Sequence, residues 1–207
     1  QIDPIPLTVS MFVKFNLINC LSMGVFPLFI ISCADPGSPI FRQKQAQKLS
    51  CDLQKLAPVV SAHEADQMAI TAVEEAAKLS RDYKPARLAW FNNWLVNRGL
   101  RERGLCYHWR DDLFLPLFQL KLSTLDLHLA TSRQGTLLEH NGIVVTARNQ
   151  PFNQGIIIDA WRQGGRLWWG RFNQDKNHPW KKLKRDHTPM VLRPLLMPKH
   201  YPKTTKP

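Results

Sequence analysis

Three residues in the second half of the 207-residue chain carry side chains suited to nucleophilic catalysis: Cys106, His140 and Asp159. The thiolate of a cysteine is a nucleophile, and both the positive end of a helix dipole and a neighbouring imidazolium stabilise it. A carboxylate can hold the imidazole in one tautomer and stabilise its charged form. These residue types, in this order, predict a catalytic Cys-His-Asp site.

Two predicted strands bring His140 and Asp159 together. Residues 142–147 (GIVVTA) and 155–160 (GIIIDA) are rich in β-branched side chains, which is typical of strands. If the two strands pair as an antiparallel hairpin, the start of the first lies opposite the end of the second. His140 and Asp159 then share one edge. A helix that begins near Cys106 and abuts this edge directs the thiol at His140, and its free amides can donate to an oxyanion.

Each of these residues also has an ordinary structural explanation. A single cysteine in a helix is often a small buried hydrophobe. His128 competes with His140 as the base, although its place in the middle of a predicted strand suits a solvated or supporting residue. His108 points to another side of the helix than Cys106 and is interpreted as structural. Asp159 is harder to explain without a partner, because an unpaired carboxylate at the border of a core is costly.

Helical patterns precede the strands along the chain, and the earliest, a moderate one, occupies residues 41–56. A capping box at Ser61 and Glu64 begins an amphipathic helix. Pro85 opens a second helix, whose aromatic residues are predicted to be core. The third helix, from Cys106, must stop or kink at Pro116. The predicted strands are residues 125–131, 142–147, 155–161 and 166–170. Helices followed by strands predict an α+β domain with an antiparallel sheet.

The segments Gly104-Leu105-Cys106, Glu139-His140-Asn141 and Ile158-Asp159-Ala160 resemble the motifs of the papain-like superfamily, most closely its transglutaminase-like branch. The similarity covers residues 85–172. It departs from the branch at Asn141, where an alanine or serine before a tryptophan is common. The resemblance implies a papain/transglutaminase-like fold, and a Cys-His-Asp hydrolase or acyl transferase that acts on amide bonds. No metal or organic cofactor is implied.

The amino-terminal region has the pattern of a secretory signal. Residues 1–10 are expected to be upstream translated sequence, and an apolar run occupies residues 15–32. The boundary FIISCA resembles the bacterial lipobox, in which Cys33 would be acylated and become the mature amino terminus. Ala34 after this cysteine favours, by the same resemblance, sorting to the outer membrane, facing the periplasm. The alternative is an uncleaved membrane anchor, because about 18 apolar residues approach the length that spans a bilayer.

The chain is thus expected to have four segments. They are an upstream and signal segment at residues 1–32, a lipid-anchored tether and linker at 33–60, a papain-like α+β domain at 61–175 and a basic proline-rich tail at 176–207. We expect this tail to be extended or partly disordered. Without the signal, Cys51 and Cys106 are the remaining thiols. In an oxidising compartment these two thiols could form one disulfide, whereas their spacing does not fit a metal site.

The positive charge is concentrated near the carboxyl terminus. The net charge is +12, and the last 32 residues hold nine lysines and arginines against one aspartate. Such a surface favours anionic lipid, an acidic cell-wall polymer or nucleic acid, but no nucleic-acid-binding motif accompanies it. We therefore expect an envelope-anchored cysteine hydrolase or acyl transferase whose substrate is a peptide or peptidoglycan. The alternative is a non-catalytic lipoprotein that acts as a binding or scaffold module.

Overall fold

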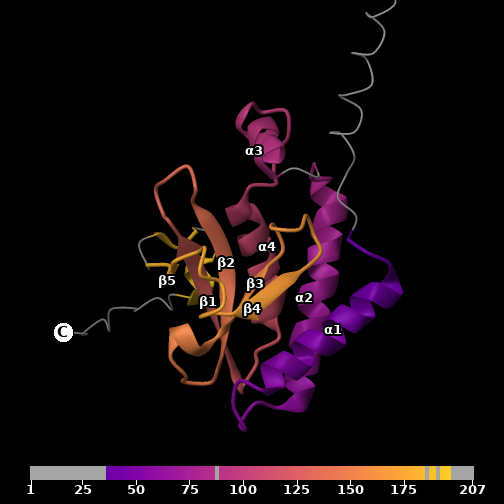
Figure 1. Cartoon of the computed structure of the whole chain (residues 1–207), viewed down its shortest axis with the longest axis vertical. Coiled ribbons are helices and arrows are strands. Elements are labelled where there is room, and N and C mark those ends of the chain that lie inside the picture. The colour runs from indigo at the N-terminus through magenta and orange to yellow at the C-terminus, as the bar shows by residue number, and fades with distance from the viewer. Residues whose placement is uncertain (1–35, 87–88, 185–186, 190–191, 197–207) are drawn as a thin grey trace, which may run out of the picture.

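A computed structural model of the chain describes residues 36–86, 89–184, 187–189 and 192–196, without the side chains of residues 89, 90 and 195. The helices α1 (Pro39–Gln54), α2 (Ala62–Tyr83) and α4 (Cys106–Gln119) pack with one face of an antiparallel sheet (Figure 1). Helix α3 (Ala89–Asn97) projects beyond this layer, and η2 (Phe152–Gln154) and α5 (Arg193–Leu196) are short. The predicted α+β class with an antiparallel sheet is confirmed.

The sheet has five strands in the order β4-β3-β2-β1-β5. Their bounds are β1 (Leu125–Ser132), β2 (His140–Ala147), β3 (Ile156–Asp159), β4 (Trp168–Arg171) and β5 (Trp180–Lys182). All eight residues of the central strand β2 are buried. Ile143 and Val145 face the core under the helices, while Val144 joins a smaller cluster with Ala130, Ile157 and Trp180. Strand β2 is therefore covered on both faces.

Helix α2 is tied to the start of β1 through its first turn. The Ser61 hydroxyl accepts a hydrogen bond from the Glu64 amide at 3.4 Å, as the capping pattern predicts. The Glu64 carboxylate accepts four bonds of 2.6–2.8 Å from the amides and hydroxyls of Ser123 and Thr124. Burial opposes ionisation of Glu64, but these hydrogen bonds outweigh it and lower its pKa to about 2.

Helix α1 agrees with the helical pattern of residues 41–56, but it corrects the prediction that residues 33–60 are a tether and linker outside the domain. Residues 39–54 are helical, and Leu49 and Leu53 are fully buried against the rest of the core. Ser38 caps this helix by accepting a bond from the Phe41 amide at 3.2 Å. Its apolar positions are few, so burial on α2 rather than a strong local pattern holds it in the domain. The predicted signal segment and Cys33 lie outside the described residues.

The predicted extended tail is also corrected. Strand β5 pairs with β1, with Trp180 opposite Ser132, and the Trp180 indole is buried against the smaller cluster. A tryptophan among lysines lets one side chain cover the sheet while its neighbours stay in solvent. Residues 197–207 lie outside the described residues.

Two further details of the helices differ from expectation. Helix α4 continues through Pro116 to Gln119, because the buried side chains of Phe114 and Leu117 keep this turn packed in the core. Trp94 on α3 was expected in the core but is 46% exposed, and it stacks on Phe91. No helix within the described ranges has the length and apolar character needed to span a membrane.

The place of α1 in the core can be tested by truncating one side chain. Replacing Leu53 with alanine leaves a cavity between α1 and the rest of the domain, so we expect the free energy of unfolding to fall by about 2–5 kcal/mol. The matched control Gln47→Ala, on the exposed side of the same helix, should change it by less than about 0.5 kcal/mol. Equal, small effects in chemical denaturation would show that α1 is a loosely attached segment.

Candidate active site

A tight turn before α4 sets the position of Cys106. Gly104 has φ +127°, and a Cβ there would lie 2.8 Å from Asn92 Nδ2, so this position requires glycine. The Gly104 carbonyl accepts bonds from Asn92 Nδ2 at 2.9 Å and from Trp109 Nε1 at 3.1 Å. These bonds hold Cys106 as the first residue of α4, as the sequence predicted. Its amide has no intrahelical partner and is available to a ligand.

His108 caps the same helix with its side chain. Nδ1 accepts from the amides of Gly104 and Leu105 at 3.2 and 3.3 Å. Burial and the positive charge of Arg103 lower the pKa of His108, which keeps the ring neutral and able to accept. The structural role predicted for His108 agrees with these contacts.

His140 and Asp159 form the buried pair that the hairpin predicts. The β2–β3 register pairs Ile143 with Ile158, so His140 and Asp159 are diagonal neighbours on one face of the sheet. His140 Nε2 lies 2.6 Å from Asp159 Oδ2. Both side chains are almost inaccessible to solvent.

The environment favours the charged form of both partners. Burial of His140 lowers its pKa, but the Asp159 carboxylate and the Cys106 thiol outweigh burial and raise the pKa of His140 to about 9. Burial of Asp159 raises its pKa, yet His140 and Arg162 together lower it. An imidazolium–carboxylate pair therefore exists at neutral pH.

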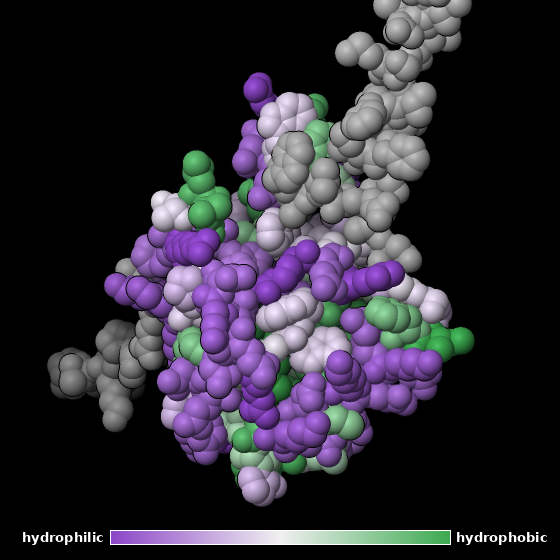
Figure 2. Space-filling model, viewed as in Figure 1, coloured by the Kyte–Doolittle hydropathy of each residue, from purple (hydrophilic) through white to green (hydrophobic). Residues whose placement is uncertain are grey.

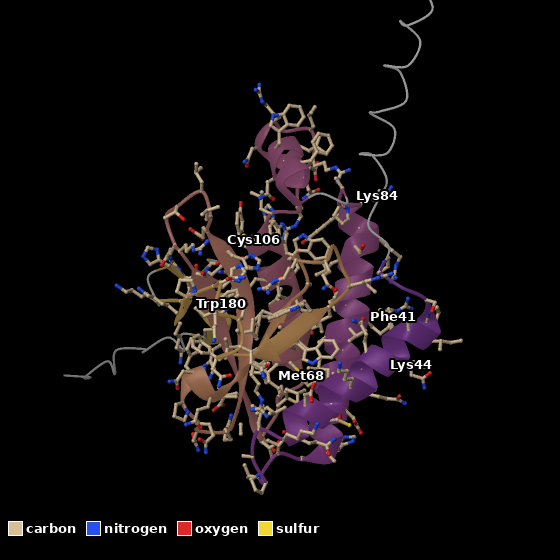
Figure 3. All side chains as sticks on the ribbon, in the orientation of Figure 1. Phe41, Lys44, Met68, Lys84, Cys106 and Trp180 are labelled. Carbon is tan, nitrogen blue, oxygen red and sulfur yellow. The ribbon has the colours of Figure 1, made fainter. Side chains whose placement is uncertain are left out.

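The thiol of Cys106 completes the arrangement. Its side chain is 9% exposed, and Sγ lies 3.8 Å from the carbonyl oxygen of Glu139, the residue before His140. Cys106 is close enough to raise the pKa of His140, although His140 Nδ1 is buried without a hydrogen bond of normal geometry in the described part of the chain. Bonds between catalytic groups are often long in unliganded sites. The three predicted residues therefore lie close together at the start of β2, and Figure 3 labels Cys106 near this end of the strand.

The wall around His140 includes two residues, His178 and Trp180, that sequence reasoning did not single out for the site. The His140 ring packs against the rings of Trp161, His178 and Trp180, with centroids 4.9, 5.0 and 5.4 Å away. Two of these belong to the segment predicted as an extended tail. The only signal for them in the sequence was the pair of aromatic rings, His178 and Trp180, within a polar run. Such a pair does not by itself indicate where in the fold these residues lie.

Arg162 extends the buried ion pair to a second carboxylate. Its Nε donates to Asp159 Oδ2 at 3.0 Å and its Nη2 donates to Asp175 Oδ2 at 2.8 Å. Asp175 also accepts from His178 at 2.9 Å and from Trp180 Nε1 at 3.0 Å. Burial alone would raise the pKa of Asp175, but these bonds lower it to about 2. This network fixes the wall against the His140–Asp159 pair.

Asn141 was noted in the sequence only as a departure from the transglutaminase-like pattern. In the structure its Nδ2 donates to Cys106 Sγ at 3.5 Å and to Glu139 Oε1 at 3.0 Å, and its Oδ1 accepts from Arg110. No local pattern in the sequence joins Arg110 to Asn141, because they lie 31 positions apart.

The other chemical candidates lie elsewhere. His128 bonds Thr146 at 3.0 Å and packs on Phe152, so its contacts lie within the sheet rather than at Cys106. Cys51 and Cys106 are both free thiols, which excludes the disulfide alternative for this structure. In the ranges that the structure covers, His, Cys, Asp and Glu form no group of three or more suited to a metal ion.

Compared with models of protein families, with curated proteins and with solved structures, the chain matches none of them. The functional interpretation therefore depends on the geometry of its own residues.

The cap on α4 predicts a measurable loss of stability. His108→Ala removes the acceptor for two amides, so the free energy of unfolding should fall by about 1 kcal/mol, as for other helix caps. His63→Ala, in the exposed first turn of α2, is the matched control and should have a much smaller effect. Denaturant titration measures both. If the two variants lose the same amount, His108 is not a cap.

The His140–Asp159 pair predicts a dependence on pH. Because the pKa of His140 is raised from 6.5 to about 9, its pairing stabilises the fold fully below pH 6.5 and progressively less as the pH rises through about 9. The excess of the wild-type free energy of unfolding over that of Asp159→Asn should decline across this range. Ring resonances in NMR should show His140 titrating near 9, and lower in the variant. A wild-type midpoint below 6.5 would contradict the charged pair.

Proposed function

We propose that this protein is a cysteine hydrolase or acyl transferase of papain-like, transglutaminase-like type, acting on amide bonds. One observation carries the proposal. Asp159 occupies Nε2 of His140, which leaves Nδ1, buried and without a normal hydrogen bond, as the nitrogen for the neighbouring Cys106 thiol. A Cys-His-Asp site requires this arrangement, in which one imidazole nitrogen bonds the carboxylate and the other serves the thiol.

The reaction follows from these positions. In the reactive ion pair the proton of the Cys106 thiol is on Nδ1 of His140, as part of the imidazolium that Asp159 stabilises, and the thiolate attacks the carbonyl carbon of the amide. The carbonyl electrons form an oxyanion, to which the free amide of Cys106 donates. When the carbonyl re-forms, the C–N bond breaks and the leaving amine takes the proton from His140. Water, or a second amine in a transferase, then attacks the thioester, gives its proton to His140 and releases the thiol.

The cell envelope is the proposed location, with Cys33 as the lipidated residue and the outer membrane as the anchoring site. The proposed substrate is a peptide or the stem peptide of peptidoglycan. The basic surface would keep the domain near an anionic polymer. Exposed apolar residues Leu137 and Leu138 lie at the tip of the β1–β2 loop, just before His140, and Figure 2 shows a hydrophobic projection at upper left, where Figure 1 has this loop. We propose that these exposed side chains contact the substrate.

One observation favours a second candidate. The low exposure of Cys106 and the burial of His140 and Asp159 fit a non-catalytic binding or scaffold module that keeps the buried ion pair for stability. The two functions differ in the reactivity of the thiol, because a scaffold does not need Cys106 to be nucleophilic.

Thiol alkylation separates the two candidates. With iodoacetamide near neutral pH, we expect Cys106 to react faster than the exposed Cys51, despite its lower exposure, because the neighbouring His140 imidazolium stabilises its thiolate. His140→Ala should slow alkylation of Cys106 by about 100-fold or more, in the range of general-base contributions, and leave Cys51 unchanged. Mass spectrometry of the two cysteine peptides gives both rates in one sample.

Sluggish labelling of Cys106 that does not depend on His140 would favour the scaffold. For the enzyme, incubation with purified peptidoglycan should release muropeptides, and Cys106→Ser should abolish the release while Cys51→Ser retains it.

A further inference from the structure

We propose that Asn141 is a further catalytic residue, whose side-chain amide stabilises the Cys106 thiolate, and that Arg110 is the residue that positions it. This inference rests on the proposed function, since it concerns the same nucleophile. It assigns a role to the one residue at which the sequence departs from the transglutaminase-like pattern.

The orientation of the Asn141 amide is fixed by chemistry. Arg110 is buried and can only donate, so the Asn141 oxygen must face its guanidinium. The NH2 group then faces Cys106 Sγ at 3.5 Å and Glu139 Oε1 at 3.0 Å. In the reversed orientation, the NH2 group of Asn141 would face the donors of the Arg110 guanidinium. The Asn141 oxygen would then face Cys106 Sγ and Glu139 Oε1, and neither would receive a hydrogen bond from it. Asn141 is therefore held as a donor to sulfur.

Arg110 is itself held rigidly. It lies one helical turn after Cys106, its side chain is almost completely buried, and its Nε donates to Asp111 at 2.7 Å. A buried guanidinium needs such partners, because an unpaired buried charge is strongly unfavourable. Its planar fork binds the Asp111 carboxylate and the Asn141 oxygen together, which a lysine cannot reproduce. The same helix thus supplies the nucleophile and the group that orients its donor.

The strength of the hydrogen bond from Asn141 to Cys106 depends on the charge of the sulfur. A neutral thiol is a weak acceptor, whereas hydrogen bonds to charged acceptors are about twice as strong. The Asn141 amide consequently stabilises the thiolate more than the thiol, and it favours transfer of the proton to His140. His140 and Asn141 are adjacent in β2, so their side chains leave opposite faces of the strand. They reach Cys106 from different sides, and one removes the proton while the other stabilises the remaining charge.

The test is the rate of alkylation of Cys106 in the folded full-length protein. Asn141→Leu keeps the approximate shape and adds no charge, but removes the donor. We expect the rate at neutral pH to fall about 10- to 100-fold, the range for loss of a hydrogen bond to a charged group. The half-rate point of the pH profile should move upward, with an unchanged plateau at high pH. Arg110→Lys should give the same direction with a smaller factor, and Gln47→Leu, which removes an amide from the exposed side of α1, should change nothing.

A purely structural role predicts the opposite sign. If Asn141 only ties α4 to β2, its loss loosens this contact, exposes the buried Cys106 and speeds its labelling at every pH. Faster or unchanged labelling in Asn141→Leu, with fast His140-dependent labelling in the wild type, would overturn this inference alone. If Asn141→Leu does not fold, Arg110→Lys decides, together with the ultraviolet absorbance of the thiolate. Slow wild-type labelling that is independent of His140 would instead overturn the proposed function.

Discussion

A buried chain of alternating charges holds the candidate site together. The imidazolium of His140, the carboxylate of Asp159, the guanidinium of Arg162 and the carboxylate of Asp175 follow one another at 2.6, 3.0 and 2.8 Å. None of these charges would be stable alone in an apolar environment, but each has an opposite neighbour and several hydrogen bonds. Since Asp159 belongs to β3 and Asp175 to the connection before β5, the chain of charges also fixes the sheet edge relative to the carboxyl-terminal segment.

The position of the site follows from the double covering of β2. Helix α4 covers one face through Ile143 and Val145, and the segment with Trp180 covers the other. At the first turn of α4 and the first residues of β2, the two layers meet. Alternation along the strand then sends His140 toward the aromatic wall and Asn141 toward α4. Cys106 at the start of α4 is thereby reached by side chains from both layers, which neither layer could achieve alone.

Much of the site could be predicted from local patterns. Gly104 before an amphipathic run indicated the start of α4, and the two isoleucine- and valine-rich stretches indicated a hairpin with His140 and Asp159 at one edge. Predictions were less successful for segments that lack a strong local sequence pattern. The segment around Leu53 has only a moderate helical pattern and was assigned to the linker, and the segment around Trp180 was assigned to the tail, because the order of both comes from burial against other elements.

The sequence by itself determined the types of the chemical groups, the local turn that opens the helix and the pairing of two adjacent strands, because these depend on residues close together in the chain. Only the tertiary structure decided that Arg110 orients Asn141, that Arg162 joins Asp159 to Asp175, and that the aromatic wall of His140 includes Trp180. These contacts join distant segments, and they exist only when burial of the whole core brings those segments within hydrogen-bond reach. The depth of Cys106, on which its reactivity depends, was decided in the same way.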